Sequence, residues 1–289
     1  MRPVGLWRLG TYAGPMPPSP LTLMAVHAHP DDEASGTGGV LARYADEGIR
    51  TVLVTCTNGE LGDAPGGVKP GEPGHDEAEV VVERRKELEA SCKLLGVTDL
   101  ELLGYHDSGM MGWPQNDASD AFWHTPVDTA AARLVELMDR YRPQVVVTYD
   151  ENGFYGHPDH IQANRITVAA ARASGIPEKL YYTAIRRSSI AGFAALLREH
   201  GIEPPGEIEE GDRDFGTPDD RVTTTVDCRR WADRKYDGLA AHASQSENIF
   251  FLRMGRPLFA TVFGRETFVR VDDRSGSPVP EDDLFAGLR

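Results

Sequence analysis

Between residues 21 and 185, short runs rich in β-branched and other apolar residues alternate with longer segments of helical spacing. The runs cover 21–27, 50–56, 100–104, 144–149 and 180–185, and the helical segments cover 39–47, 79–95, 127–140 and 160–173. Strands and helices that alternate in this way form right-handed βαβ units, which bury a parallel sheet between two layers of helices. The chain is therefore predicted to have an α/β fold with a doubly wound, Rossmann-like and mostly parallel sheet.

The pattern also suggests how the chain is organised. Residues 1–20 are rich in proline and are predicted to be an N-terminal extension, while 21–202 are predicted to form one Rossmann-like domain. Residues 203–289 are predicted to form a smaller α+β part, with a strand at 221–227, a helix at 230–245 and a β-hairpin at 260–271 centred on Gly264. The long loops 58–75 and 203–220 are candidate lids, because loops of this length in a domain are usually functional or disordered.

Polar side chains crowd the end of the first predicted strand. The apolar run is followed by the segment Val-His-Ala-His-Pro-Asp-Asp-Glu at 26–33, which holds two imidazoles and three carboxylates. Placing so many ionisable groups at the edge of a core is costly unless a divalent metal binds them. The alternative interpretation is an acidic helix start, with an Asp as N-cap, which explains one or two carboxylates but neither histidine.

A second polar cluster, 149–160, follows the fourth predicted strand. In a doubly wound sheet the first and fourth strands are neighbours at the switch point, where ligands bind at the carboxyl ends of the strands. Two nitrogens and one oxygen with an open position are typical of catalytic zinc. His29, Asp32 and His160 are therefore the predicted metal ligands, with Asp31 beside the ion and His27 outside the ligand set.

Composition limits the classes of partner. The chain has 45 acidic and 30 basic residues and a net charge of −15, which argues against nucleic acid or an anionic membrane as its partner. Its three cysteines are far apart, so neither a disulfide framework nor a thiolate zinc site is expected, as is usual in a reducing cytoplasm. No signal peptide or membrane span is recognised, and a cytoplasmic location is expected. Whether the chain forms a homo-oligomer stays open.

The segments His29-Pro-Asp-Asp-Glu33 and Gly156-His-Pro-Asp-His160 together resemble the motifs of the LmbE / PIG-L family of zinc-dependent N-deacetylases. This family includes enzymes of mycothiol metabolism, and the resemblance covers roughly residues 20–185 and resumes near 241–245. It implies one Zn²⁺, or another divalent ion such as Fe²⁺, on the three ligands predicted above. It also implies roles for further residues: Asp31 as general base, His157 as general acid with Asp159 as its orienting partner, Tyr155 as a mobile oxyanion donor, Arg84 and Asp107 as sugar contacts, and His242 and Gln245 as part of the substrate pocket.

The implied chemistry is hydrolysis of an amide. Zinc lowers the pKa of its water from about 16 towards 7, and a carboxylate beside His157 is expected to raise the pKa of that imidazole so that it can protonate the leaving amine. Several residues have simpler alternatives. Asp159 could be a helix N-cap, Arg84 part of a solvated helix face, Asp107 part of an Asx turn, and 242–245 an ordinary helix terminus.

The expected function is zinc-dependent removal of an N-acyl group, such as acetyl, from an N-acetylglucosamine-type conjugate, in thiol-cofactor or natural-product biosynthesis. A mycothiol S-conjugate amidase is the alternative, although this chain has Ser35-Gly36-Thr37 where those enzymes typically carry Ser-Lys-Gly. Two other classes are weaker. A nucleotide-binding module is suggested by the glycines at 36–39, but three carboxylates precede them and would repel a diphosphate. A metal phosphoesterase commonly needs a second ion and further carboxylate ligands.

Overall fold

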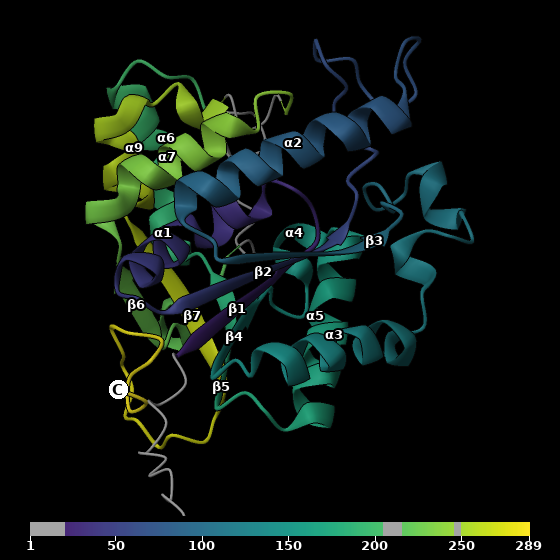
Figure 1. The fold of residues 1–289 in the computed structure, drawn as a ribbon. Coiled ribbons are helices and arrows are strands. Elements are labelled where there is room, and N and C mark those ends of the chain that lie inside the picture. Colours follow the sequence, from purple (N-terminus) through teal and green to yellow (C-terminus); the bar gives the residue numbers. More distant parts are fainter. Residues whose placement is uncertain (1–20, 205–215, 246–249) are drawn as a thin grey trace, which may run out of the picture.

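A seven-stranded sheet forms the centre of the protein in the computed structural model, which describes residues 21–204, 216–245 and 250–289 (Figure 1). The strand order is β3-β2-β1-β4-β5-β7-β6. The strands are β1 (Thr22–His27), β2 (Arg50–Thr57), β3 (Asp99–Tyr105), β4 (Val145–Thr148), β5 (Lys179–Ala184), β6 (Thr224–Asp227) and β7 (Arg265–Asp273). The first five are parallel, β7 is antiparallel to both of its neighbours, and β1 lies beside β4 at the switch point. The predicted fold class is confirmed.

Helices cover both faces of the sheet because successive side chains of each strand point to opposite sides. In β1, Leu23 and Ala25 join one apolar core, and Met24 and Val26 join the other. The first core lies under α1 (Asp32–Asp46), α2 (Glu77–Leu95), α7 (Ala232–Ala241) and α9 (Gly255–Phe263), and the second lies under α3 (Val127–Tyr141) and α5 (Pro158–Ser174). The short α4 (Gly153–Gly156) precedes α5, and α6 (Arg187–Glu199) packs near α9 (Figure 1).

The first helix starts earlier than predicted. It begins at Asp32, directly after the polar segment, so the glycines at 36–39 lie inside α1 rather than in a phosphate loop. Close packing explains two of them. A Cβ on Gly38 would lie 3.1 Å from Cγ of Lys235, and one on Gly39 would lie 2.7 Å from Cβ of Cys228. Tertiary packing therefore accounts for glycines that resembled a nucleotide-binding signal.

The predicted hairpin at 260–271 is wrong. Residues 255–263 form helix α9, and the chain then enters the single long strand β7. The run Leu258-Phe259 is buried on the helix, and short apolar runs of this kind do not distinguish a helix from a strand by periodicity alone. The predicted helix at 230–245 is also shorter, because α7 ends at Ala241.

The C-terminal strands β6 and β7 extend the same sheet, so residues after 203 are built onto the first part of the chain. The boundaries at 202 and 203 stay a prediction. The predicted extension 1–20 lies outside the described residues, as does much of the acidic loop 203–220.

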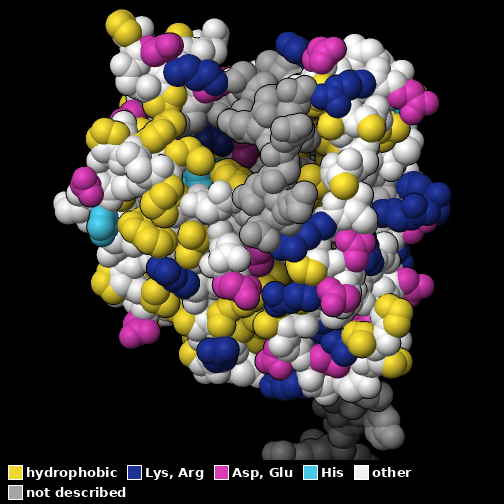
Figure 2. Space-filling model, turned by 180° about the vertical axis from the view of Figure 1, so that it is seen from behind, with side chains coloured by type: hydrophobic (Ala, Val, Ile, Leu, Met, Phe, Trp, Pro, Cys, Tyr) yellow, Lys and Arg dark blue, Asp and Glu magenta, His cyan; other side chains and the backbone are white. Residues whose placement is uncertain are grey.

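The surface shows a mixed charge pattern. On the face shown in Figure 2, basic and acidic side chains are scattered among apolar ones. Within the described residues, no helix has both the length and the hydropathy needed to cross a bilayer.

Candidate active site

The polar segment after β1 folds into a tight turn that leads straight into α1. Its shape depends on Asp31, a non-glycine residue with φ of 104° and ψ of −28°. The backbone N–H of His29 donates to Oδ2 of Asp32, three residues further along the chain, at 2.8 Å, and this hydrogen bond closes the turn. His29 and Asp32 are thereby held on one side of the turn, at the carboxyl end of the strand.

The structure brings the three predicted metal ligands together. His160, in the first turn of α5, reaches the same point from the loop after β4: its Nε2 lies 3.5 Å from Oδ1 of Asp32. Nδ1 of His29 lies 3.4 Å from Oδ2 of Asp32. Two ligands of one tetrahedral zinc, with bonds of about 2.1 Å, lie about 3.4 Å apart. Each separation is therefore close to that expected for a shared ion, with His29 and His160 approaching different oxygens of Asp32.

The state of His160 also fits a metal. Nε2 of His160 is buried and has no hydrogen-bond partner among the described residues. Burial lowers the pKa of His160 to about 4, which keeps the imidazole neutral, as a ligand must be. Ligand atoms of His29, His157 and His160 all lie within 4.8 Å of one another, and so do those of His29, Asp107, His157 and Asp159. Both groups share His29 and His157, so the described residues hold one candidate centre. Asp32 is in neither group, and its place beside the other two predicted ligands rests on the two separations above.

Tyr149, which was not among the predicted site residues, supports two of the predicted ligands. Its hydroxyl donates to Oδ2 of Asp32 at 2.6 Å and accepts the backbone N–H of Ala28 at 2.9 Å. Its ring stacks on His160, with centroids 4.1 Å apart and planes at 12°. The hydroxyl also lies 3.3 Å from Nδ1 of His27, whose Nε2 contacts Thr37, so His27 lies behind the site, as expected. The sequence signal for Tyr149 was its place directly after β4.

Asp159 has a different partner from the one expected. Its carboxylate lies 3.2 Å from Nε2 of His29 and accepts hydrogen bonds from the backbone and hydroxyl of Ser108. Only its backbone N–H meets His157, donating to Nδ1 at 3.2 Å. The interpretation of Asp159 as the orienting carboxylate of His157 is therefore wrong. A carboxylate on the far nitrogen of a ligating histidine is the usual support of a metal centre, because it fixes the tautomer and the ring.

The expected rise in the pKa of His157 does not occur. Burial lowers the pKa of this imidazole to about 2, and the neighbouring His29 and His160 add to the effect. Since Nδ1 accepts the N–H of Asp159, the neutral ring carries its proton on Nε2. His157 is thus a neutral hydrogen-bond donor, with its ring centroid 4.6 Å from that of His29 and 5.0 Å from that of His160.

Asp31 has the properties expected of a proton acceptor. Burial raises the pKa of its carboxyl to about 6, with Arg84 acting in the opposite direction through Nη2, which lies 3.3 Å from Oδ2. A general base works best when its pKa is near the pH at which the enzyme operates.

Tyr155 lies in α4, with 47% of its surface exposed and its ring centroid 5.1 Å from that of His160. The preceding residue, Phe154, has φ of 67° and ψ of −66°, a strained γ-turn conformation for a non-glycine residue. Tyr155 is therefore presented at the mouth of the site by a strained turn.

The four residues expected to contact substrate are all buried and hydrogen-bond to other groups of the protein: Arg84, Asp107, His242 and Gln245. Arg84 donates to the backbone oxygens of Pro30 and Gly59, and His242, fully buried, contacts Glu33. Gln245 accepts the N–H of Asp63 and donates to its carbonyl, each at 3.1 Å.

Asp107 lies 3.7 Å from Nε2 of His29 and accepts the N–H of Gly109, which makes the Asx turn that was the alternative reading. The side chains of His242 and Gln245 are held by Glu33 and by the backbone of Asp63, and their assignment to the substrate pocket stays a prediction.

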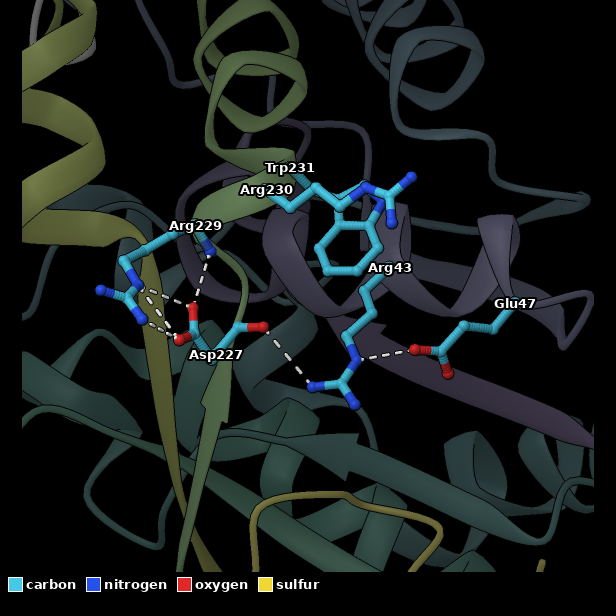
Figure 3. Close-up of a pocket in the computed structure, with 6 residues that line it drawn as sticks. All are labelled: Arg43, Glu47, Asp227, Arg229, Arg230 and Trp231. Carbon is cyan, nitrogen blue, oxygen red and sulfur yellow. Dashed lines mark hydrogen bonds and ion pairs between the residues drawn. The ribbon is translucent and has the colours of Figure 1, made fainter.

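Two hollows lie outside this cluster. One, of about 640 Å³, opens between the loop after β2 and the loop after β3, and is lined by Leu61, Gly71, Glu72, His75, Asp76, Glu77, Ala78 and Gln115. The other, of about 660 Å³, is lined by Arg43, Glu47, Asp227, Arg229, Arg230 and Trp231 (Figure 3). In the second hollow Arg43 pairs with Glu47 and Arg229 with Asp227, so most of its charge is already matched within the protein.

Comparison with known proteins places the chain in a family. Residues 24–171, which contain every predicted metal ligand, match the family model described as GlcNAc-PI de-N-acetylase. The chain is 44% identical to a 1D-myo-inositol 2-acetamido-2-deoxy-alpha-D-glucopyranoside deacetylase of Acidothermus cellulolyticus, over 92% of the chain and 95% of the relative. This chain belongs to the PIG-L family. A second deacetylase of the same name, from Salinispora arenicola, is 41% identical over 92% of the chain and 91% of the relative.

Solved structures of more distant proteins share the fold. The N,N'-diacetylchitobiose deacetylase of Pyrococcus horikoshii has a TM-score of 0.56 and 19% identity, with 86% of this chain and 83% of that one covered. The 4-carboxy-2-hydroxymuconate hydratase of Pseudomonas putida has a TM-score of 0.57 and 20% identity, with 88% and 97% covered. Because the fold carries both reactions, fold alone does not decide the chemistry. The close relatives do: this PIG-L protein is a metal-dependent hydrolase of a linear amide bond.

Proposed function

We propose that this protein uses zinc to remove the acetyl group from the amino sugar of 1D-myo-inositol 2-acetamido-2-deoxy-alpha-D-glucopyranoside. The observation that carries the proposal is the convergence of His29, Asp32 and His160 beside Asp31 at the switch point of the sheet. Relatives that are 44% and 41% identical over nearly the whole chain are named for this substrate. The same relatives favour a deacetylase over an S-conjugate amidase.

His29, Asp32 and His160 would hold the zinc, which when bound would supply Lewis-acid activation of the amide carbonyl and of a water. Asp31 takes the proton that this water releases as its oxygen attacks the carbonyl carbon. The same carboxyl then gives the proton to the sugar nitrogen as the carbon–nitrogen bond breaks, so that acetate and a free amine are formed. A group with a pKa of about 6 can perform both transfers near neutral pH.

His157 and Tyr155 donate hydrogen bonds to the developing oxyanion in this proposal. The neutral His157 offers its Nε2–H because Nδ1 is occupied by the backbone of Asp159. A neutral imidazole is a suitable donor, since it polarises a carbonyl without having to lose a proton first. One well-placed donor of this kind contributes about 3 kcal/mol to transition-state stabilisation.

The proposal is tested by measuring free amine released from the inositol conjugate and from free N-acetylglucosamine. We expect the conjugate to be the better substrate, and a chelator to abolish the activity until Zn²⁺ is restored. His29→Ala and Asp32→Ala should lose bound zinc and activity together, whereas Asp31→Ala should keep zinc and retain only a small, measurable kcat. His200→Ala serves as the control, because His200 caps the far helix α6 and contacts Leu196.

Two results would contradict the proposal. Full activity in a metal-free preparation would exclude the zinc mechanism. Release of amine from free N-acetylglucosamine at the same kcat/KM as from the conjugate would exclude the proposed substrate.

A further inference from the structure

The backbone of Asp31 adopts a conformation that residues other than glycine rarely adopt. Its φ of 104° lies in the left-handed half of the map, where a non-glycine residue is strained. Such a conformation persists only where the surrounding structure holds it. The groups that hold Asp31 therefore decide where its carboxylate points.

Glu33 holds the backbone N–H of Asp31. Its side chain is fully buried, and Oε2 accepts that N–H at 2.9 Å. The other oxygen, Oε1, accepts the hydroxyl of Ser91 at 2.5 Å and contacts Nε2 of His242 at 2.7 Å. All three contacts are shielded from solvent. Because each oxygen of the Glu33 carboxylate has at least one of these partners, the hydrogen bonds fix the orientation of the whole carboxylate.

These partners come from three separate helices. Glu33 lies in the first turn of α1, Ser91 lies in α2, and His242 is the C-cap of α7. Gly238 of α7 allows the helices to approach, because a Cβ there would lie 3.3 Å from Oγ of Ser91. The C-terminal part of the chain is thus joined directly to the turn that carries Asp31.

We propose that Glu33 and His242 are positioning residues for Asp31. The proposal rests on the role of Asp31 as proton acceptor in the proposed function. His242 donates to Glu33, Glu33 fixes the N–H of Asp31, and Arg84 holds the carboxylate from the other side at 3.3 Å. Without His242 the carboxylate of Glu33 loses a donor, and the strained peptide of Asp31 is free to relax and turn its side chain away from the metal ligands.

His242 has no direct contact with the substrate in this scheme. Its side chain is fully buried behind Glu33, with Nε2 2.7 Å from Oε1 of that carboxylate, so this nitrogen faces Glu33. Its loss should therefore change kcat and leave KM and bound zinc unchanged.

The experiment measures kcat, KM, bound zinc and the melting temperature of His242→Ala. A displacement of about 1 Å in a catalytic group can cost about 100-fold in rate, so we expect kcat to fall by about 10- to 100-fold. His242→Gln should recover most of the loss, because its amide can donate to Glu33. Ser91→Ala removes another donor to the same oxygen and should lower kcat in the same way, even if His242→Ala fails to fold.

Tyr181→Phe is the matched control, because it removes a hydroxyl that donates to the buried carboxylate of Glu281 at 2.8 Å, away from the site. It should lower the melting temperature and leave kcat unchanged. The decisive comparison repeats His242→Ala, or Ser91→Ala, in an Asp31→Ala background. If these residues act through Asp31, the second substitution should cause no further loss of kcat.

Four outcomes separate the possibilities. A raised KM at unchanged kcat in His242→Ala would make His242 a substrate contact and overturn the proposal. The same fold-loss of kcat in the wild-type and Asp31→Ala backgrounds would also overturn it. So would a wild-type kcat in both His242→Ala and Ser91→Ala. Asp31→Ala with wild-type kcat would instead refute the proposed function itself.

Discussion

Removing one oxygen atom, in Tyr149→Phe, should weaken both the metal site and the fold. The hydroxyl of Tyr149 lies between Asp32, to which it donates at 2.6 Å, and the N–H of Ala28, which it accepts at 2.9 Å. Burial and the neighbouring Asp32 raise the pKa of this hydroxyl, so it stays protonated and keeps donating. The ring, which stacks on His160, is retained in the variant.

The size of the effect follows from these two contacts. A buried N–H left without its acceptor costs about 1–3 kcal/mol of stability. Loss of a hydrogen bond to a ligating carboxylate lowers metal affinity by about 10- to 100-fold, because the ligand is no longer held in its orientation. The variant should therefore unfold at lower urea without metal and bind zinc more weakly when folded.

Urea unfolding of the metal-free protein measures the first effect, and competition for zinc with a chromophoric chelator measures the second. Tyr181→Phe is the control: its hydroxyl donates to Glu281, outside the site, so it should lose stability and keep zinc affinity. Zinc affinity of Tyr149→Phe within twofold of wild type would refute the reasoning, because Asp32 would then be oriented without the hydroxyl.

Three further predictions concern other parts of the structure. Asp159→Asn should weaken zinc binding by about 10- to 100-fold, since the carboxylate contacts His29; unchanged zinc affinity in the chelator assay would argue against that role. Gly39→Ala should lower the free energy of unfolding in urea by about 1–3 kcal/mol, since a Cβ would lie 2.7 Å from Cβ of Cys228; unaltered stability would show that the helix can shift. Burial alone would raise the pKa of Glu281, but hydrogen bonds, led by that from Lys179, outweigh burial and lower it. The ionised carboxylate therefore stabilises the fold above its unfolded pKa of about 4.3, and this stabilisation is lost as the pH falls through the lowered pKa of the folded state. As the pH is lowered, the free energy of unfolding should then fall less steeply in Glu281→Gln than in wild type. Equal slopes would count against a stabilising role of the ionised Glu281.

The sequence by itself determined the parallel part of the sheet and predicted the three metal ligands. Alternating apolar runs and helical segments specify βαβ units, and handedness and connection rules leave few arrangements of them. His29 and Asp32 lie three residues apart on one turn, so their relative position is a local property. His160 could be assigned because a helix that follows a neighbouring strand must begin at the same edge of the sheet.

Tertiary structure decided what surrounds those ligands. Glu33 and His242 are 209 residues apart, and only the packing of α1, α2 and α7 brings them within 2.7 Å. The direction of the Asp159 carboxylate depended on Ser108, in a loop with no regular pattern. The apolar run before Gly264 could have been strand or helix, and its burial on the core made it α9. Local geometry is encoded within a few residues, whereas a buried side chain takes the partners that the packed helices and loops place around it, and no short pattern contains those.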